Sequence, residues 1–171
     1  AASVNVRNRS HSIAAEAVIP DGGAEGVLIA DGGRFGGYSL YVQGGKLRYA
    51  YNLLGRARFH IVSTVDVPVG PHILGCTFEK TGPQPFGAGG IVRLYIDGEQ
   101  VGEGELPRTV PFIFALGQGL QAGADEGNPV TEEYTSPFRF TGALKRVVVD
   151  LRGADPLRDL DQELRIDMSR Q

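Results

Sequence analysis

Residues 37–52 read GYSLYVQGGKLRYAYN, and this stretch decides the fold class. Apolar and polar side chains alternate on both sides of the Gly44-Gly45 pair, which is the pattern of two half-buried antiparallel strands. Glycine adopts the positive φ that a two-residue turn demands, so the pair predicts a β-hairpin. Asp97-Gly98 carries the same signal further along the chain.

The same period of two recurs along most of the 171 residues, in short runs bounded by Gly, Pro, Asp or Asn. With 25 Gly and 10 Pro, about one position in five resists the interior of a helix. The pattern predicts an all-β fold, a two-sheet antiparallel β-sandwich of jelly-roll type. The expected strands are 12–19, 26–31, 37–43, 46–52, 57–64, 72–80, 91–97, 100–105, 111–116, 119–123 and 138–151.

No linker-like stretch divides the chain, so we expect one domain over 1–171, with an entry strand or linker at 1–11. Leucines at approximate helical spacing in 157–166 predict a short C-terminal helix or a docked tail within 155–171. The only Met is Met168 and the chain begins at Ala1, so we expect a processed chain or a fragment of a longer protein.

The composition narrows the classes of function. The net charge is −3 and basic residues are scattered singly, so no continuous track for phosphates exists and nucleic acid is not the expected partner. The sequence contains no run of 18 apolar residues, so no membrane span is predicted.

The single cysteine, Cys76, excludes an internal disulfide and a Cys-based zinc site, and it does not indicate the cellular compartment. Leu74 and Phe78 share its face, so Cys76 is expected in the core.

The sequence contains no strong catalytic motif. A retaining glycosidase needs two carboxylates about 5 Å apart facing a cleft, and no strand interior has that pattern. Glu103 and Glu105 flank Gly104 after a hairpin, where a solvated edge explains them. The three histidines are isolated from one another, and no Gly-x-Ser-x-Gly elbow occurs. We therefore expect no catalytic residue in this chain.

The segment 123–134 concentrates four acidic residues, while no Lys or Arg occurs between Arg108 and Arg139. Hard cations such as Ca²⁺ take oxygen ligands from carboxylates, amides and carbonyls, and a loop rich in Gly and Pro can aim several of them at one point. Asp125 and Asn128, with Glu126, are therefore candidate metal ligands. The alternative is a solvated acidic loop.

Recognition of a sugar by a β-sandwich would use exposed aromatic rings, and the chain has no Trp. Tyr38 and Tyr51, with Arg34, are the candidate ligand-binding residues, although packing explains the tyrosines better. Tyr41 and Tyr49 flank one hairpin and are expected to form a cross-strand pair. Arg34, Arg48, Arg56 and Arg58 could bind sulfate or carboxylate groups through forked hydrogen bonds, and solvated strand faces account for them equally well.

Several strings together resemble the C-terminal region of a group of bacterial arylsulfatases. They are NRSHSI at 8–13, GGRFGGYSLYV at 32–42 and YAYN at 49–52, followed in the same order by 94–98, 107–112, 125–134 and 138–151. The resemblance implies a concanavalin A-like, laminin-G-like β-sandwich behind a sulfatase catalytic domain. Sulfatases carry their nucleophile in a Cys/Ser-x-Pro-x-Arg signature, but Thr77, Phe78 and Glu79 follow Cys76. No nucleophile is therefore carried over.

Two functions follow as expectations. The first is a non-catalytic accessory domain of an arylsulfatase-like sulfuric ester hydrolase, which packs on the upstream catalytic domain of the same chain or shapes access to it. The alternative is a carbohydrate-binding module of lectin or laminin-G type. An exposed apolar face would favour docking.

Overall fold

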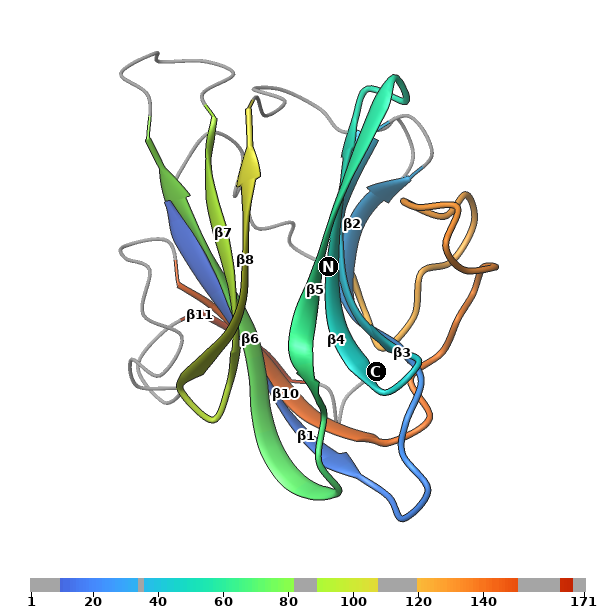
Figure 1. Ribbon diagram of the computed structural model, residues 1–171. Helices are drawn as coiled ribbons and strands as arrows, with labels where there is room; N and C mark the ends of the chain where they lie inside the picture. The colour runs from blue at the N-terminus through green and yellow to red at the C-terminus, as the bar shows by residue number, and fades with distance from the viewer. Residues whose placement is uncertain (1–9, 34–35, 82–88, 108–119, 151–163, 168–171) are drawn as a thin grey trace.

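The computed structural model describes residues 10–33, 36–81, 89–107, 120–150 and 164–167, which form two antiparallel sheets packed face to face (Figure 1). One sheet has the strand order β11-β10-β1-β6-β7-β8 and the other β5-β4-β3-β2-β9. The predicted two-sheet β-sandwich is confirmed. The strands are β1 His11–Ile19, β2 Gly26–Gly33, β3 Gly36–Gln43, β4 Lys46–Leu53, β5 Ala57–Asp66, β6 Gly70–Lys80, β7 Gly90–Ile96, β8 Glu99–Leu106, β9 Leu120–Ala122, β10 Ala143–Asp150 and β11 Leu164–Asp167.

Both predicted hairpins are present. Gly44 and Gly45 join β3 to β4 with φ angles of 61° and 78°. Asp97 and Gly98 join β7 to β8 with φ angles of 51° and 83°. Two successive positive φ angles are typical of a type I′ turn, whose twist matches that of the strands it connects.

The strand predicted at 138–151 begins only at Ala143. Backbone groups of the residues before it form hydrogen bonds with β2 and the residues that precede β2. The Phe138 carbonyl accepts a hydrogen bond from the Val27 amide, and the Thr141 amide donates to the Glu25 carbonyl. Arg139 forms an isolated parallel bridge with Val27. The strand predicted at 111–116 lies outside the described residues.

The helix expected within 157–166 is wrong at its C-terminal part, because Leu164–Asp167 is the strand β11. Its residues pair antiparallel with β10, with Ile166 opposite Val147. An otherwise free sheet edge offers backbone partners to every second residue, and this tertiary pairing overrides a weak helical spacing. None of the described residues belongs to a helix long and apolar enough to cross a membrane.

The main core lies between the sheets and takes alternate residues from each strand. Val92, Leu94 and Ile96 are buried as predicted, and Cys76 is 1% exposed. Burial raises the pKa of the Cys76 thiol to about 12.

The tyrosine pair predicted across the first hairpin is wrong. Tyr41 lies opposite Arg48, and Tyr49 lies opposite Leu40. Adjacent rungs project to opposite faces of a sheet, so Tyr49 enters the main core and Tyr41 the outer face.

β8 of the six-stranded sheet packs closely against β5 of the five-stranded sheet. A Cβ atom added at Gly104 would lie 2.3 Å from Cγ1 of Ile61, and one added at Gly102 would lie 3.2 Å from the Val62 carbonyl oxygen. The Thr64 hydroxyl donates to the Val101 carbonyl at 3.2 Å across the same junction. Only residues without a side chain leave room for this contact, which holds the edge strand β5 against β8.

Candidate functional site

Residues 123–141, which we call the strap, cross the outer face of the five-stranded sheet between β9 and β10. Figure 1 shows this orange segment outside the layer formed by β2, β3 and β4. Tyr134 and Phe138 of the strap stack at 4.8 Å between ring centroids, and both contact Tyr41 edge-on. Val27, Ala30 and Ala50 complete this second apolar cluster. The strap is therefore packed on the sheet by its own small core.

Asp125 is the polar centre of the strap and is fully buried. Its Oδ2 accepts hydrogen bonds from the Tyr134 hydroxyl at 2.5 Å and from the Val130 amide at 3.0 Å. The Tyr134 hydroxyl also lies 2.9 Å from Oγ of Ser39 on β3. Burial raises the pKa of Asp125, and the two hydrogen bonds offset part of that rise.

The other acidic side chains of the strap lie near basic side chains of the strap itself and of β5. Glu126 pairs with Arg139 at 2.8 Å. Glu132 lies 3.8 Å from Arg58, and Glu133 lies 3.6 Å from Nε2 of His60. The sequence could not show the β5 partners, because the strap reaches β5 only in the folded chain.

The three candidate metal ligands are placed differently. The Asp125 side chain points into the protein, whereas Glu126 and Asn128 are exposed. Across the described ranges, no group of three or more His, Cys, Asp and Glu side chains is arranged to hold a metal ion. Cation binding by Asp125, Asn128 and Glu126 stays a prediction.

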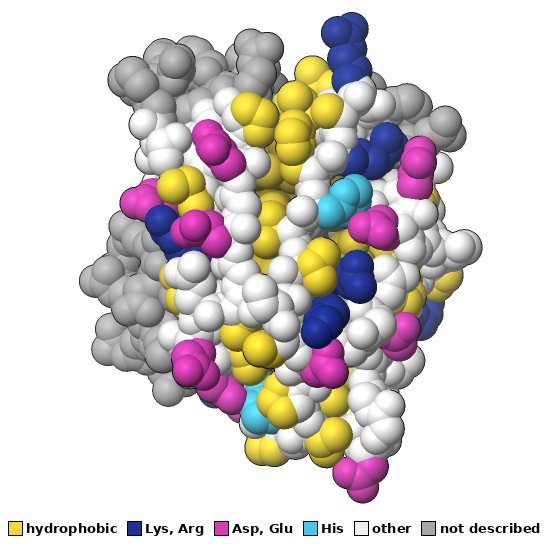
Figure 2. Space-filling model, in the orientation of Figure 1, with side chains coloured by type: hydrophobic (Ala, Val, Ile, Leu, Met, Phe, Trp, Pro, Cys, Tyr) yellow, Lys and Arg dark blue, Asp and Glu magenta, His cyan; other side chains and the backbone are white. Residues whose placement is uncertain are grey.

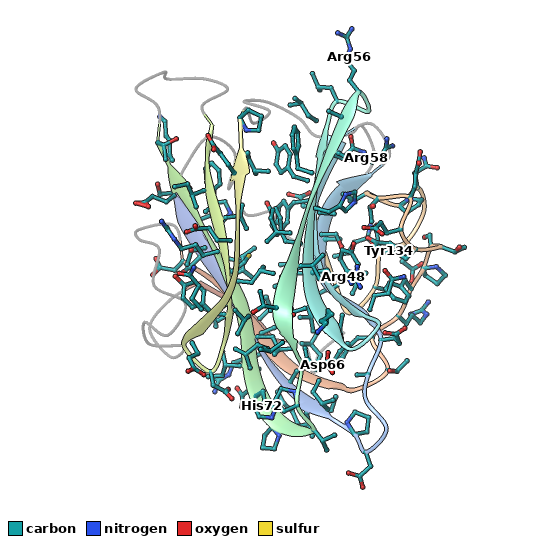
Figure 3. All side chains as sticks on the ribbon, in the orientation of Figure 1. Arg48, Arg56, Arg58, Asp66, His72 and Tyr134 are labelled. Atoms are coloured by element: carbon teal, nitrogen blue, oxygen red, sulfur yellow. The ribbon has the colours of Figure 1, made fainter. Side chains whose placement is uncertain are left out.

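Beside the strap, four basic residues follow the ribbon formed by β4 and β5: Lys46, Arg48, Arg56 and Arg58. We call them the basic strip. Figure 3 shows Arg56, Arg58 and Arg48 one below another along this ribbon, and Figure 2 shows Lys and Arg side chains along the same line of the surface. The three arginines could be named from the sequence, but Lys46 could not, because only the register of β4 and β5 brings it into line with them.

The basic strip is incompletely neutralised. Lys46 pairs with Asp66 at 2.7 Å, and Arg58 makes only the long contact with Glu132, whose side chain is 85% exposed. Nε of Arg58 is buried and has no hydrogen-bond partner among the described residues. Within the part of the chain that the structure describes, neither Arg48 nor Arg56 forms an ion pair.

The register sets the spacing of the basic strip. Arg48 lies opposite Val62, which is four residues beyond Arg58 on β5. Four residues of strand span about 13 Å at roughly 3.3 Å per residue. Guanidinium groups at this spacing can engage successive anionic groups of an extended ligand through forked hydrogen bonds.

The predicted ligand-binding tyrosines are inside the sandwich. Tyr38 and Tyr51 are 1% and 4% exposed, as the packing interpretation expects, so neither ring offers its face to a sugar. Tyr38 stacks on Tyr49 at 6.2 Å between ring centroids. Arg34 lies outside the described residues. Glu103 and Glu105 are exposed, and Glu103 pairs with Arg93 at 2.9 Å.

The exposed large hydrophobic side chains among the described residues gather on one element. They lie on β5 and the turns at its two ends, and they are between 38% and 54% exposed. β5 is also one of the two edge strands of its sheet as the structure describes it. This set could not be predicted from the sequence, because it depends on which residues of β5 and its turns the fold buries. The four residues are Leu54, Val62, Val65 and Val69.

Comparison with known protein families finds none that matches the sequence, and no curated protein matches it. Among solved structures, laminin G domains LG4-5 of the mouse laminin α1 chain superpose with a TM-score of 0.59 at 14% identity, over 96% of this chain and 41% of that chain. The fold is a laminin-G-like β-sandwich. A heptameric SAP-like pentraxin from Limulus polyphemus gives a TM-score of 0.52 at 10% identity, over 93% of this chain and 79% of the pentraxin. The chain thus spans less than half the length of the laminin chain that it matches.

Proposed function

We propose that this laminin-G-like sandwich is a non-catalytic binding module for an extended sulfated or carboxylated glycan, and that the basic strip is its binding surface. The observation that carries the proposal is the incomplete neutralisation of that strip. Among the described residues, Arg48 and Arg56 form no ion pair, and the one ion pair of Arg58 is the 3.8 Å contact with Glu132. Nε of Arg48 donates to the Gln43 carbonyl at 2.9 Å, and the remaining guanidinium N–H groups of Arg48 and those of Arg56 would pair with a bound sulfate or carboxylate.

The spacing of the strip supports an extended ligand over a single small anion. Arg48 on β4 and Arg58 on β5 are about 13 Å apart along the strand direction and would contact separate charged groups of one polymer. Attraction between exposed charges is screened by salt, so the binding is expected to weaken steeply as ionic strength rises.

The test is binding of the protein to a polysaccharide that has no carboxylate groups, in its sulfated and desulfated forms, by calorimetry at two salt concentrations. We expect binding of the sulfated form, and loss of about tenfold in affinity or more for each of Arg48→Ala and Arg56→Ala, because each removes a charge-assisted hydrogen bond. Lys145→Ala is the control, since Lys145 is exposed on β10 of the other sheet. Equal binding of the desulfated form, or an equal loss with the control, would contradict the proposal.

The four exposed hydrophobic residues on β5 and its flanking turns, which we call the apolar edge of β5, favour a second function. As an accessory domain of an arylsulfatase-like hydrolase, the sandwich would dock on the upstream catalytic domain of the same chain. Exposed valines on an unpaired edge strand support such a docking surface. The parent activity rests on the sequence resemblance alone.

This second function predicts no turnover of an aryl sulfate by the chain as given. It also predicts that Val65→Ser with Val69→Ser lowers the melting temperature of the longer protein but leaves glycan binding unchanged, because neither valine belongs to the basic strip. Turnover by the purified chain, or a longer protein whose melting temperature is unaffected, would contradict it.

A further inference from the structure

His72 occupies the end of the sandwich where the β5–β6 turn connects the two sheets, and Figure 3 shows it below Asp66. Its ring lies between two oxygen atoms. Nδ1 is 2.6 Å from Oδ2 of Asp97, and Nε2 is 3.0 Å from the carbonyl oxygen of Val69. The side chain is 17% exposed, so protein atoms surround most of the ring.

The two contacts together select one protonation state. A neutral imidazole has one N–H and one lone pair, whereas an ionised carboxylate and a backbone carbonyl can only accept. A neutral His72 would therefore set a nitrogen lone pair against an oxygen at one of its two contacts. The imidazolium donates at both positions, so the observed geometry fits the protonated ring.

Asp97 is held in place independently of His72. Its Oδ1 accepts a hydrogen bond from the Ile73 amide at 2.8 Å, and its own amide donates to the Ile73 carbonyl at 2.8 Å. The carboxylate consequently cannot follow the ring if the ring moves. On the other side, the Val67 amide donates to the Gly45 carbonyl at 2.7 Å, which ties the β5–β6 turn to the β3–β4 turn.

We propose that His72 is a proton-operated clamp: the protonated ring fastens the β5–β6 turn, through Val69, to the β7–β8 turn, and deprotonation releases that turn. The ring thus joins the connection between the two sheets to a hairpin of the six-stranded sheet. Because Val69 belongs to the apolar edge of β5, the clamp also sets the position of one end of that edge. This inference does not depend on either proposed function.

The charges around the ring support the clamp. The hydrogen bond to Asp97 raises the pKa of His72 above its usual value, and the hydrogen bond to Val69 acts in the same direction against partial burial. Among the described residues, Asp97 is the charged group in contact with the ring. Those on the surrounding strands are Glu16 and Arg146, paired at 2.8 Å, Lys46 and Asp66, paired at 2.7 Å, and the exposed Glu99 and Lys145.

The direction of the pH effect follows from the raised pKa. The clamp is fully formed below the pKa of a histidine in the unfolded chain, about 6.5, and is lost as pH rises through the higher folded value. The β5–β6 turn is therefore expected to be attached more firmly to the β7–β8 turn at mildly acidic pH than at alkaline pH.

The test is an NMR titration of the His72 ring in the unaltered chain. We expect a midpoint above 6.5 and nitrogen shifts of a doubly protonated ring below it, and Asp97→Asn should lower the midpoint. A midpoint at or below 6.5, or a neutral ring in the folded protein at pH 5.5, would overturn the proposal.

Amide exchange measures the clamp itself. We expect the protection factor at Val67, in the β5–β6 turn, to fall as pH rises through the midpoint in the unaltered chain, and this pH dependence to disappear in His72→Gln, whose side chain does not titrate. His60→Gln is the matched control and should keep the dependence. The same dependence in both variants would refute the clamp. If His72→Gln does not fold, the ring titration of the unaltered chain decides.

Discussion

The Tyr134 hydroxyl lies 2.5 Å from Oδ2 of Asp125, nine residues earlier in the chain, and this contact closes the strap on itself above the five-stranded sheet. Ser39 of β3 lies 2.9 Å from the same hydroxyl, so the contact also fastens the strap to the sheet. The strap therefore depends on a buried polar group as well as on its apolar cluster.

Tyr134→Phe is expected to lower the free energy of unfolding by about 1–3 kcal/mol, because it removes a donor from a buried carboxylate. Urea unfolding at neutral pH measures the loss. Tyr95→Phe on β7 is the matched control, since the half-buried Tyr95 has no part in the strap, and it should change the value by no more than about 0.5 kcal/mol. An equal loss in both variants would show that the Asp125 contact is not what stabilises the strap.

Asp125→Asn is expected to flatten the dependence of stability on pH. Burial raises the folded pKa of Asp125, so its favourable contribution is fully present below the pKa of an unfolded aspartate, about 3.9, and is lost as pH rises through the folded value. Asparagine stays neutral and can still accept from Tyr134. The free energy of unfolding should be measured for both proteins at a series of pH values, and the difference between them should change across this window. A difference that stays constant would contradict the raised pKa.

Calorimetric titration with calcium tests the predicted cation site. A bound cation gives heat and a raised melting temperature, and both should vanish in Asn128→Ala. If the strap is instead neutralised by its own basic partners, calcium gives no heat, and Arg139→Ala lowers the melting temperature because Glu126 loses its 2.8 Å partner. Absence of heat in the unaltered protein would reject the cation site.

Gly104→Ala is expected to cost about 1–3 kcal/mol of stability, because its Cβ would lie 2.3 Å from Cγ1 of Ile61 and either the Ile61 side chain or one of the two strands must shift. Gly102→Ala is the graded comparison, since its nearest atom would lie 3.2 Å away. Chemical denaturation should rank Gly104→Ala as the more destabilising of the two. The reverse order would contradict the close approach of β5 and β8.

Cys76, the only thiol in the chain, is expected to resist alkylation in the folded protein. It is buried and its pKa is raised to about 12, so the reactive thiolate is scarce at pH 8 and reagent cannot reach it. A maleimide reaction followed by mass spectrometry should be slow in buffer and fast in urea. Equal rates in the two conditions would show that Cys76 is accessible.

Local sequence determined the strands and their turns. Alternation around Gly44-Gly45 and Asp97-Gly98 sets side-chain faces and turn type within a few residues, so β3, β4, β7 and β8 were predictable with their hairpins. The core position of Cys76 followed from the same period of two.

Tertiary structure decided the features that depend on contacts between distant segments. The pairing of β11 with β10 replaced a weak helical spacing, and the strap used residues 138–141 for contacts with β2 and its flanking residues instead of extending β10. In the folded chain Glu132 lies near Arg58 and Glu133 near His60, in each case more than 70 positions away in the sequence. His72 contacts Asp97, which belongs to the β7–β8 turn. Sequence patterns report the periodicity of one segment, whereas charge neutralisation and ring protonation depend on which segments the fold brings within a few ångströms.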